Sequence, residues 1–302
     1  MASAPRTTEP SPQGGGEEGE SAVAFRYAPA AKADGVSVAA PPAVLALVPL
    51  FLHGWRGTPD PSGSGAALRC RPAGGGFEIF APVLPEGRHR AATAFEAADV
   101  VASAVAALAM GGPGVILPHA GAVESPAGLV LLLADTTGGK STLALTLAAA
   151  GWRLFSDDRL GLRGEGRGAS GIALGLAAKL RLPLPPSATG LSRFVRGRMR
   201  QSWPTLTYLG LGPDEQAFPG TQAPVAACLL LDRSGGASRL NPARPARLVR
   251  ALAESAAAPW LSPAEVMAAA ASHAELPAFH LTYAEAPAAA ALLLERFGRG
   301  GG

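Results

Sequence analysis

The segment that most constrains the fold is residues 128–151, GLVLLLADTTGGKSTLALTLAAAG. A continuous apolar run bounded by turn residues predicts a buried strand over 128–134. The Ala- and Leu-rich run 141–151 predicts a helix, because these residues have high helix propensity and Gly151 can stop it. Strand-like and helix-like segments continue to alternate afterwards, so the sequence predicts an α/β domain over residues 113–302.

The loop between this strand and this helix has the composition of a phosphate-binding loop. Residues 134–141, ADTTGGKS, match the Walker A pattern G-x-x-x-x-G-K-[ST] except at the first position, where Ala134 stands for Gly. Backbone N–H groups and a helix N-terminus attract phosphate oxygens, and glycines let the backbone approach closely. Lys140 adds a positive charge near the β- and γ-phosphates, and Ser141 is a candidate Mg²⁺ ligand. The alternative is a Gly-rich turn before a helix. The predicted nucleotide-binding residues are Ala134, Asp135, Thr136, Thr137, Gly138, Gly139, Lys140, Ser141 and Thr142.

Two adjacent acids follow the predicted helix. Asp157 and Asp158 end a short strand-like segment, WRLFSDD, and carboxyl ends of strands in α/β sheets meet at the ligand edge. One carboxylate is then available to hold Mg²⁺, and the other to accept the proton of an attacking hydroxyl. The alternative is that one Asp caps a turn and the other is solvated.

A histidine precedes the predicted buried strand. His119 lies in GVILPHAGAVE, residues 114–124, which resembles a strand. We expect His119 to end that strand and therefore to lie at the same sheet edge as the glycines and the acids. The alternative is an ordinary structural histidine.

The combination HAGAVE, GLVLLLADTTGGKSTLALTLAAAGWRLFSDD and the spacing between them resembles the catalytic domain of the HPr kinase/phosphorylase family. The resemblance is greatest to the HPr-kinase-related serine kinases found with peptide biosynthesis clusters, and it covers residues 119–158. One departure concerns a Gly-, Ile- and Asp-rich stretch of the family, which residues 169–185 replace here. The departure puts a phosphorylase activity, and HPr as a substrate, in doubt.

The resemblance implies an ATP-dependent serine kinase with a P-loop fold related to phosphoenolpyruvate carboxykinase. Lys140 and Ser141 would bind ATP phosphates and Mg²⁺. Asp157 would be the catalytic base, oriented by His119, and Asp158 a metal ligand. The acceptor would be a small protein or peptide, and the protein would form a homo-oligomer, as relatives often do.

Two rival interpretations remain open. CLLLD, residues 228–232, resembles a Walker B strand, which would make the chain an ordinary P-loop ATPase that uses Asp232. The acid pair would then be unexplained. A nucleotide-binding scaffold that is catalytically silent is the third class.

The N-terminal third has a different organisation. Residues 1–24 have no apolar periodicity and predict a disordered tail. Short strand-like pieces and an Ala-rich helix at 93–110 predict a small N-terminal α+β module over 25–112. Farther along, the basic run Arg193–Arg200, RFVRGRMR, and the pair Lys179 and Arg181 are candidates for binding an acidic substrate or a phosphoryl group; the alternative for the run is a solvated loop.

Composition excludes several classes of protein. A net charge of +3 does not indicate a nucleic-acid partner. Cys70 and Cys228 form no CxxC motif, which argues against a disulfide framework or a structural zinc site. The apolar run 43–52 is too short to span a bilayer, and no secretory signal is visible, so we expect a cytoplasmic protein without a membrane span.

Overall fold

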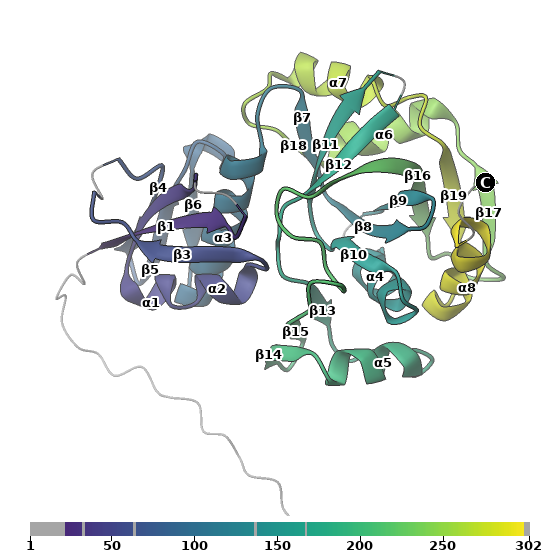
Figure 1. Cartoon of the computed structure of the whole chain (residues 1–302), viewed down its shortest axis with the longest axis horizontal. Coiled ribbons are helices and arrows are strands. Elements are labelled where there is room, and N and C mark those ends of the chain that lie inside the picture. Colours follow the sequence, from purple (N-terminus) through teal and green to yellow (C-terminus); the bar gives the residue numbers. More distant parts are fainter. Residues whose placement is uncertain (1–21, 32–33, 63–64, 136–137, 167, 299–302) are drawn as a thin grey trace, which may run out of the picture.

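The computed structural model describes residues 22–31, 34–62, 65–135, 138–166 and 168–298. Residues 1–21 of the expected tail lie outside the described residues, and so do Thr136 and Thr137. Val23 and Ala24, which were also assigned to the tail, begin the first strand. The described chain is a mixed α/β structure in which two main sheets lie side by side (Figure 1).

The N-terminal part is a six-stranded sheet with helices on one face. Its strand order is β3-β1-β2-β4-β5-β6, with β2 and β4 parallel and the other neighbours antiparallel. Alternate side chains such as Val38, Leu68 and Ile79 are fully buried in the core that the helices cover. The elements are β1 (Val23–Pro29), β2 (Val36–Ala40), α1 (Pro42–Leu45), α2 (Val48–Phe51), β3 (Trp55–Pro59), β4 (Leu68–Ala73), β5 (Gly76–Phe80), the 3₁₀ turn η1 (Pro85–Gly87), β6 (Arg88–Ala91) and α3 (Ala94–Met110).

Local sequence explains the helices of this part. The helix expected at 93–110 is α3, and it begins one residue later because the Thr93 hydroxyl accepts a hydrogen bond from the Glu96 backbone N–H at 3.1 Å. The apolar run 43–52 forms α1 and α2, and it buries Val44 and Phe51 in the core. No helix in the described ranges is long and apolar enough to cross a membrane.

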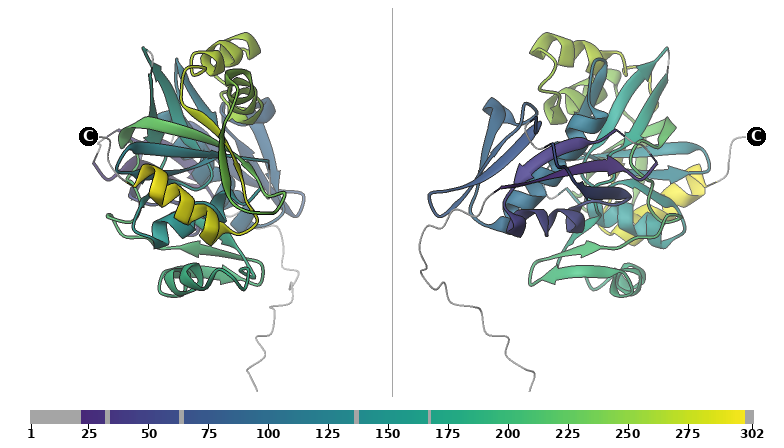
Figure 2. Two further views of the ribbon diagram at one scale, coloured as in Figure 1. Left: turned by 90° about the vertical axis from the view of Figure 1, so that its right-hand side faces the viewer. Right: turned by 60° about the vertical axis from the view of Figure 1, so that its left-hand side comes forward.

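The larger sheet contains the predicted α/β segments. Its main path is β10-β8-β9-β16-β12-β11-β7-β18, and β19 pairs with both β16 and β17. Helices α4 and α8 pack on one face, and α6 and α7 pack on the other (Figures 1 and 2). The elements are β7 (Val115–Pro118), β8 (Ala120–Ser125), β9 (Gly128–Leu133), α4 (Lys140–Ala149), β10 (Arg153–Ser156), β11 (Leu160–Glu165), β12 (Gly168–Ala173), β16 (Gln222–Asp232), β17 (Arg239–Pro242), α6 (Pro245–Ser255), β18 (Ala256–Ala257), α7 (Pro263–Ala271), β19 (Ala278–Thr282) and α8 (Ala286–Phe297).

Strand direction brings several chain segments to one edge of this sheet. Strand β16 is parallel to both β9 and β19. Strand β10 shares their direction, because β8 lies between β10 and β9 and is antiparallel to both. The carboxyl ends of these four strands therefore meet at one edge, which is where ligands bind in open α/β sheets.

The strand expected over 114–124 is split in two. Strand β7 ends at Pro118 and pairs with β11, whereas β8 begins at Ala120 and pairs with β9. His119 lies between them and does not end a strand. Because β8 is antiparallel to β9, with Ala120 opposite Leu133, His119 still lies at the edge where β9 ends.

A three-stranded sheet connects the two parts. It has the order β13-β15-β14 and lies below α4 together with α5 (Figure 1). Its aromatic residues pack on the N-terminal helices: the Phe51 and Tyr208 ring centroids are 5.0 Å apart, and those of Phe95 and Trp203 are 4.1 Å apart. The elements are β13 (Lys179–Arg181), α5 (Thr189–Arg196), β14 (Met199–Trp203) and β15 (Leu206–Leu209).

Backbone hydrogen bonds reinforce this connection just before β13. The Ala177 N–H donates to the Phe51 carbonyl at 2.8 Å, and the His53 N–H donates to the Gly175 carbonyl at 2.8 Å. The chain that leads into β13 is therefore attached to the end of α2.

Candidate functional site

Residues 134–141, here called the glycine loop, follow β9 and end in the first turn of α4, which begins at Lys140. Gly139 is the N-cap of α4 and has a φ of 86°, a conformation that favours glycine. A Cβ on Gly138 would lie 2.5 Å from the Cβ of Ala134, so this position also requires glycine. Among the described residues the positive-φ set contains one non-glycine residue, Glu86, so Ala134 needs no positive φ. The departure from the Walker A pattern is thus compatible with the backbone.

Lys140 spans the glycine loop from the first turn of α4. Its Nζ donates to the carbonyl oxygens of Ala134 at 2.8 Å and Asp135 at 3.2 Å. Only 6% of the residue is exposed. Burial lowers the pKa of Lys140, while Asp158 and Asp135 act in the opposite direction. A buried ammonium group and the N-terminus of α4 therefore converge on this loop, an arrangement that attracts anions.

Asp157 is a buried carboxylate beneath the start of α4. The residue is 3% exposed, and its Oδ2 accepts a hydrogen bond from the Lys179 N–H at 2.8 Å. Its Oδ1 is buried without a hydrogen-bond partner. Burial raises the pKa of Asp157 to about 6, although the Lys179 N–H and the nearby Ser141 hydroxyl lower it. Asp157 therefore has an unpaired oxygen next to the predicted Mg²⁺ ligand.

Asp158 faces the other way and forms the centre of an ionic cluster. Its Oδ1 lies 3.1 Å from His119 Nε2, and its Oδ2 lies 3.2 Å from Lys179 Nζ. Burial alone would raise the pKa of Asp158, but the Lys179 ammonium and His119 outweigh it and hold the pKa below its ordinary value. The side chain is 23% exposed, so this carboxylate is accessible from the cavity that it lines.

The contacts of His119 differ from the sequence prediction. We expected His119 to orient Asp157, but the structure pairs it with Asp158. The reason is that the chain turns after β10, so the two aspartates point to different sides: Asp157 lies under α4, and Asp158 lies towards the start of β8. Burial lowers the pKa of His119, opposed by Asp158.

Three further side chains belong to this site: Lys179, which the sequence offered as a candidate for binding a phosphoryl group, and Arg233 and Tyr283, which it did not. Lys179 holds both acids, with its backbone N–H on Asp157 and its ammonium group on Asp158. Arg233 and Tyr283 lie against the glycine loop, because a Cβ on Gly139 would meet the Tyr283 hydroxyl at 2.6 Å and the Arg233 Cδ at 2.8 Å. Arg233 directly follows Asp232, so the Walker B-like segment 228–232 was the one sequence pattern that pointed to the position of Arg233.

Two cavities flank the glycine loop. A cavity of about 340 Å³ lies at the start of α4 and is lined by Lys140, Ser141, Asp158, Lys179 and Arg233, among others. A larger one of about 670 Å³ lies at the ends of β9 and β16 and beside α6. His119 lines both cavities, so it marks the place where they meet.

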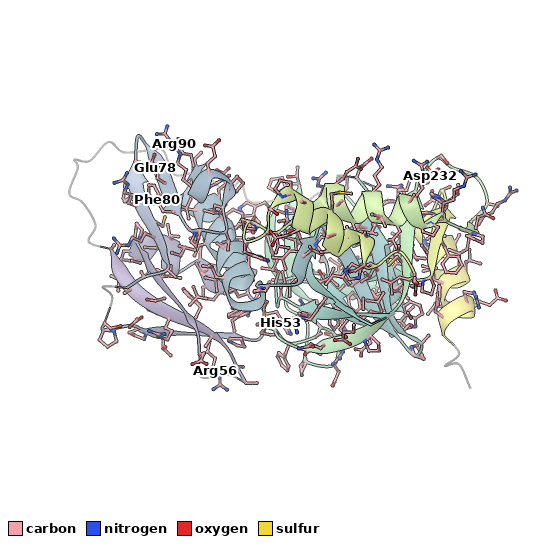
Figure 3. The ribbon with its side chains drawn as sticks, turned by 90° about the horizontal axis from the view of Figure 1, so that it is seen from above. His53, Arg56, Glu78, Phe80, Arg90 and Asp232 are labelled. Atoms are coloured by element: carbon pink, nitrogen blue, oxygen red, sulfur yellow. The ribbon has the colours of Figure 1, made fainter. Side chains whose placement is uncertain are left out.

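Among the described residues that line the cavity of Ser141, neither Asp232 nor any residue of the basic run is found. Asp232 lines the larger cavity, is exposed, and accepts a hydrogen bond from the Ser234 N–H at 2.9 Å (Figure 3). In the basic run, Arg198 pairs with Glu215, and Arg200 donates to the Pro49 carbonyl. Among the described lining residues of the two cavities, none comes from the run, whereas Lys179 and Arg181 both line the smaller cavity.

The donor set is compatible with Mg²⁺ held together with phosphate. The described residues contain no cage of three or more His, Cys, Asp or Glu side chains. Mg²⁺ seldom uses such a cage, because it keeps several waters and binds through one or two carboxylates plus substrate phosphates. The Ser141 hydroxyl and the unpaired Oδ1 of Asp157 fit that description.

Comparison with known proteins finds solved structures that match this chain. No protein-family model matches the chain, and no curated protein matches it. The HPr(Ser) kinase/phosphatase from Coxiella burnetii is similar in structure, with 16% sequence identity and a TM-score of 0.29, over 60% of this chain and 92% of that chain. The chemistry of the site therefore has to be derived from its own side chains.

Proposed function

We propose that this protein is an ATP-dependent kinase that transfers the γ-phosphoryl group of Mg-ATP to a serine hydroxyl on a small protein or peptide. The observation that carries the proposal is the His119–Asp158–Lys179 cluster, which lies in the same cavity as Lys140 and Ser141. An anion-binding loop and an accessible, oriented carboxylate are the two parts that phosphoryl transfer to a hydroxyl requires.

The glycine loop supplies the binding part of this function. Mg-ATP, when bound, supplies the transferable phosphoryl group. The loop N–H groups and the N-terminus of α4 bind its phosphates, and Lys140 exchanges its carbonyl partners for phosphate oxygens. Ser141 would hold the metal at the start of α4, with the carboxylate of Asp157 beside it. Arg233 adds a further positive charge to the cavity.

Asp158 carries out the proton transfer. The acceptor hydroxyl gives its proton to an oxygen of Asp158 as its oxygen bonds to phosphorus, and the bond from phosphorus to ADP breaks. His119 and Lys179 keep the carboxylate ionised and fix its direction. Because the Lys179 ammonium group lies beside the Asp158 carboxylate, it is also close enough to stabilise the negative charge that develops on the transferring phosphoryl group.

This assignment exchanges the roles that the resemblance implied for the two aspartates. A pKa of about 6 would suit Asp157 as a general base. However, a general base must first lie within hydrogen-bond reach of the acceptor hydroxyl, whatever its pKa. The free oxygen of Asp157 is fully covered, so an acceptor hydroxyl does not reach it. Asp158 is the acid that an acceptor can reach without movement of α4.

The larger cavity gives the acceptor a place. It is lined by Ala134 and Asp135 at the start of the glycine loop, whereas Ser141 lines the smaller cavity, and His119 lines both. An acceptor residue bound there approaches Asp158 past His119. The homo-oligomer and the cytoplasmic location stay predictions.

The rival ATPase interpretation has less support from the geometry. A Walker B acid acts beside the P-loop Ser and its metal, but Asp232 lines the other cavity and caps a turn at Ser234. The silent-scaffold interpretation leaves the ion pairs of Asp158 without a role.

Transfer of labelled phosphate from ATP to synthetic Ser-containing peptides tests the proposal. Asp158→Asn should slow transfer by about 10²–10⁴-fold, the usual effect of losing a general base, while Mg-ATP binding measured by calorimetry persists. Asp157→Asn should instead weaken nucleotide binding that depends on Mg²⁺. Asp232→Asn is the matched control and should keep most activity. Release of free phosphate alone, at a rate indifferent to Asp158, would contradict the kinase.

A further inference from the structure

One face of the N-terminal sheet is open. Helices α1 to α3 cover the face that contains Val38, Leu68 and Ile79. The registers of the six strands place the alternate residues together on the opposite face. This open face consists of Ala24, Arg26, Ala28, Ser37, Ala39, Arg56, Thr58, Arg69, Arg71, Glu78, Phe80, Arg88 and Arg90.

The open face is strongly basic. It carries six arginines, all exposed, and one acid of its own, Glu78. Glu78 pairs with Arg71 and Arg90, each at 3.0 Å, and Arg26 pairs with Asp60 at the end of β3. In the part of the chain that the structure describes, Arg56, Arg69 and Arg88 have no ion-pair partner. A chain whose net charge is +3 thus gathers a large positive excess on one surface.

Four of these arginines form a regular frame. Arg69 and Arg71 are two residues apart on β4, and Arg88 and Arg90 are two apart on β6, so each pair is separated by about 7 Å. Strand β5 lies between them and separates the pairs by about 10 Å. Phe80 lies within this frame, directly between Arg69 and Arg88, and the Arg71 guanidinium lies 5.0 Å from the centroid of its ring.

A hollow lies beside the frame. Its volume is about 490 Å³, and Arg69, Arg71 and Phe80 line it together with the small residues Ala22 and Ala39. The short side chains of β1 and β2 lie next to the long side chains of β4, which leaves room for an extended chain. Figure 3 shows Arg90, Glu78 and Phe80 together at one end of the sheet and Arg56 at the other end.

We propose that the open face binds an acidic, extended segment of a partner protein. Acidic side chains at every second position of an extended chain are about 7 Å apart, the same spacing as Arg69 and Arg71. Arginine forms paired, charge-assisted hydrogen bonds with carboxylates, and Phe80 offers an apolar contact between them. A single-stranded nucleic acid fits less well, because its bases need several aromatic platforms and the frame has one, beside the carboxylate of Glu78. This proposal does not depend on the reaction at the glycine loop.

Fluorescence anisotropy with the full-length protein tests the proposal. The probe is a fluorescein-labelled ten-residue peptide in which Glu and Ser alternate, and the reference probes are the same peptide with Lys for Glu and a ten-nucleotide oligothymidylate. We expect the acidic peptide to bind more tightly than both, with an affinity that falls as salt rises. The double variant Arg69→Glu with Arg88→Glu should weaken binding at least about tenfold. Arg69→Gln with Arg88→Gln should weaken it less, with an unchanged circular dichroism spectrum.

The matched control reverses two exposed arginines elsewhere, Arg163→Glu with Arg239→Glu. It should bind the acidic peptide with little change. Equal loss in the control, or no loss in the first variant, would refute the site. Tighter binding of the oligonucleotide, lost in the same variant, would replace the proposal with a nucleic-acid surface. Residues 1–21 contain Glu17, Glu18 and Glu20. If the acidic peptide binds only after these residues are deleted, the chain's own acidic segment occupies the open face, and the proposal of a partner protein is refuted.

Discussion

Replacing Asp157 with Asn should stabilise the protein at neutral pH, even though it removes a residue of the candidate site. Burial raises the pKa of this carboxyl from 3.8 to about 6. One pKa unit corresponds to about 1.4 kcal/mol, so keeping Asp157 ionised in the folded state costs about 3 kcal/mol. Asn keeps a carbonyl oxygen for the hydrogen bond from the Lys179 N–H and carries no charge to bury.

The pH dependence follows from the direction of this pKa change. Below about pH 4, Asp157 is protonated in both the folded and the unfolded chain, and the group costs nothing. Between about pH 4 and pH 6, the unfolded chain releases this proton while the folded protein keeps it, so the free energy of unfolding falls as pH rises. Above about pH 6 the full penalty is present. The gain from Asp157→Asn should therefore be absent near pH 4 and reach its plateau above pH 6.

Urea denaturation from pH 4 to pH 8, with EDTA present to exclude bound metal, measures this difference. Asp158→Asn is the matched control, because its neighbours hold the pKa of Asp158 below the ordinary value. Its loss should therefore destabilise the protein at neutral pH, the opposite sign for an adjacent aspartate. Destabilisation by Asp157→Asn at pH 8, or a difference from wild type that does not change with pH, would refute the reasoning.

Two further substitutions examine the glycine loop and the connection between the sheets. Gly138→Ala places a methyl group 2.5 Å from the Ala134 Cβ, so the loop must shift. Calorimetry should then show at least about tenfold weaker Mg-ATP binding without loss of the fold. Unchanged binding would mean that the loop does not hold the nucleotide. Phe51→Ala removes a ring that is 2% exposed and packs on Tyr208. Urea titration should show a free energy of unfolding that is lower by about 3–5 kcal/mol. A loss below about 1 kcal/mol would show that the aromatic contact contributes little to stability.

Elements whose signal is local were predictable from sequence. The buried strand at β9, the helix α4 and the helix α3 follow from apolar runs, helix propensity and caps, which neighbouring residues determine. Helix α7 likewise begins with a local device, a capping box formed by Ser262 and Glu265.

Features that depend on pairing between distant segments were not predictable. The break at His119 arises because β7 and β8 pair with different partners, which no local pattern reveals. The directions of Asp157 and Asp158 depend on β13, whose Lys179 lies more than twenty residues later and holds both acids. Arg233 and Tyr283 reach the glycine loop only because β16 lies beside β9 and β19 lies beside β16.

The attachment of α2 to the chain before β13 has a mechanical consequence. The Ala177 N–H is bound to the Phe51 carbonyl, and two residues later the Lys179 N–H is bound to Asp157, each at 2.8 Å. These two hydrogen bonds fix both ends of a two-residue segment, and the planar peptide units of that segment limit how far it can extend. A rotation of the N-terminal sheet against the larger one must therefore break the first bond or pull Lys179, and with it the ammonium group that holds Asp158.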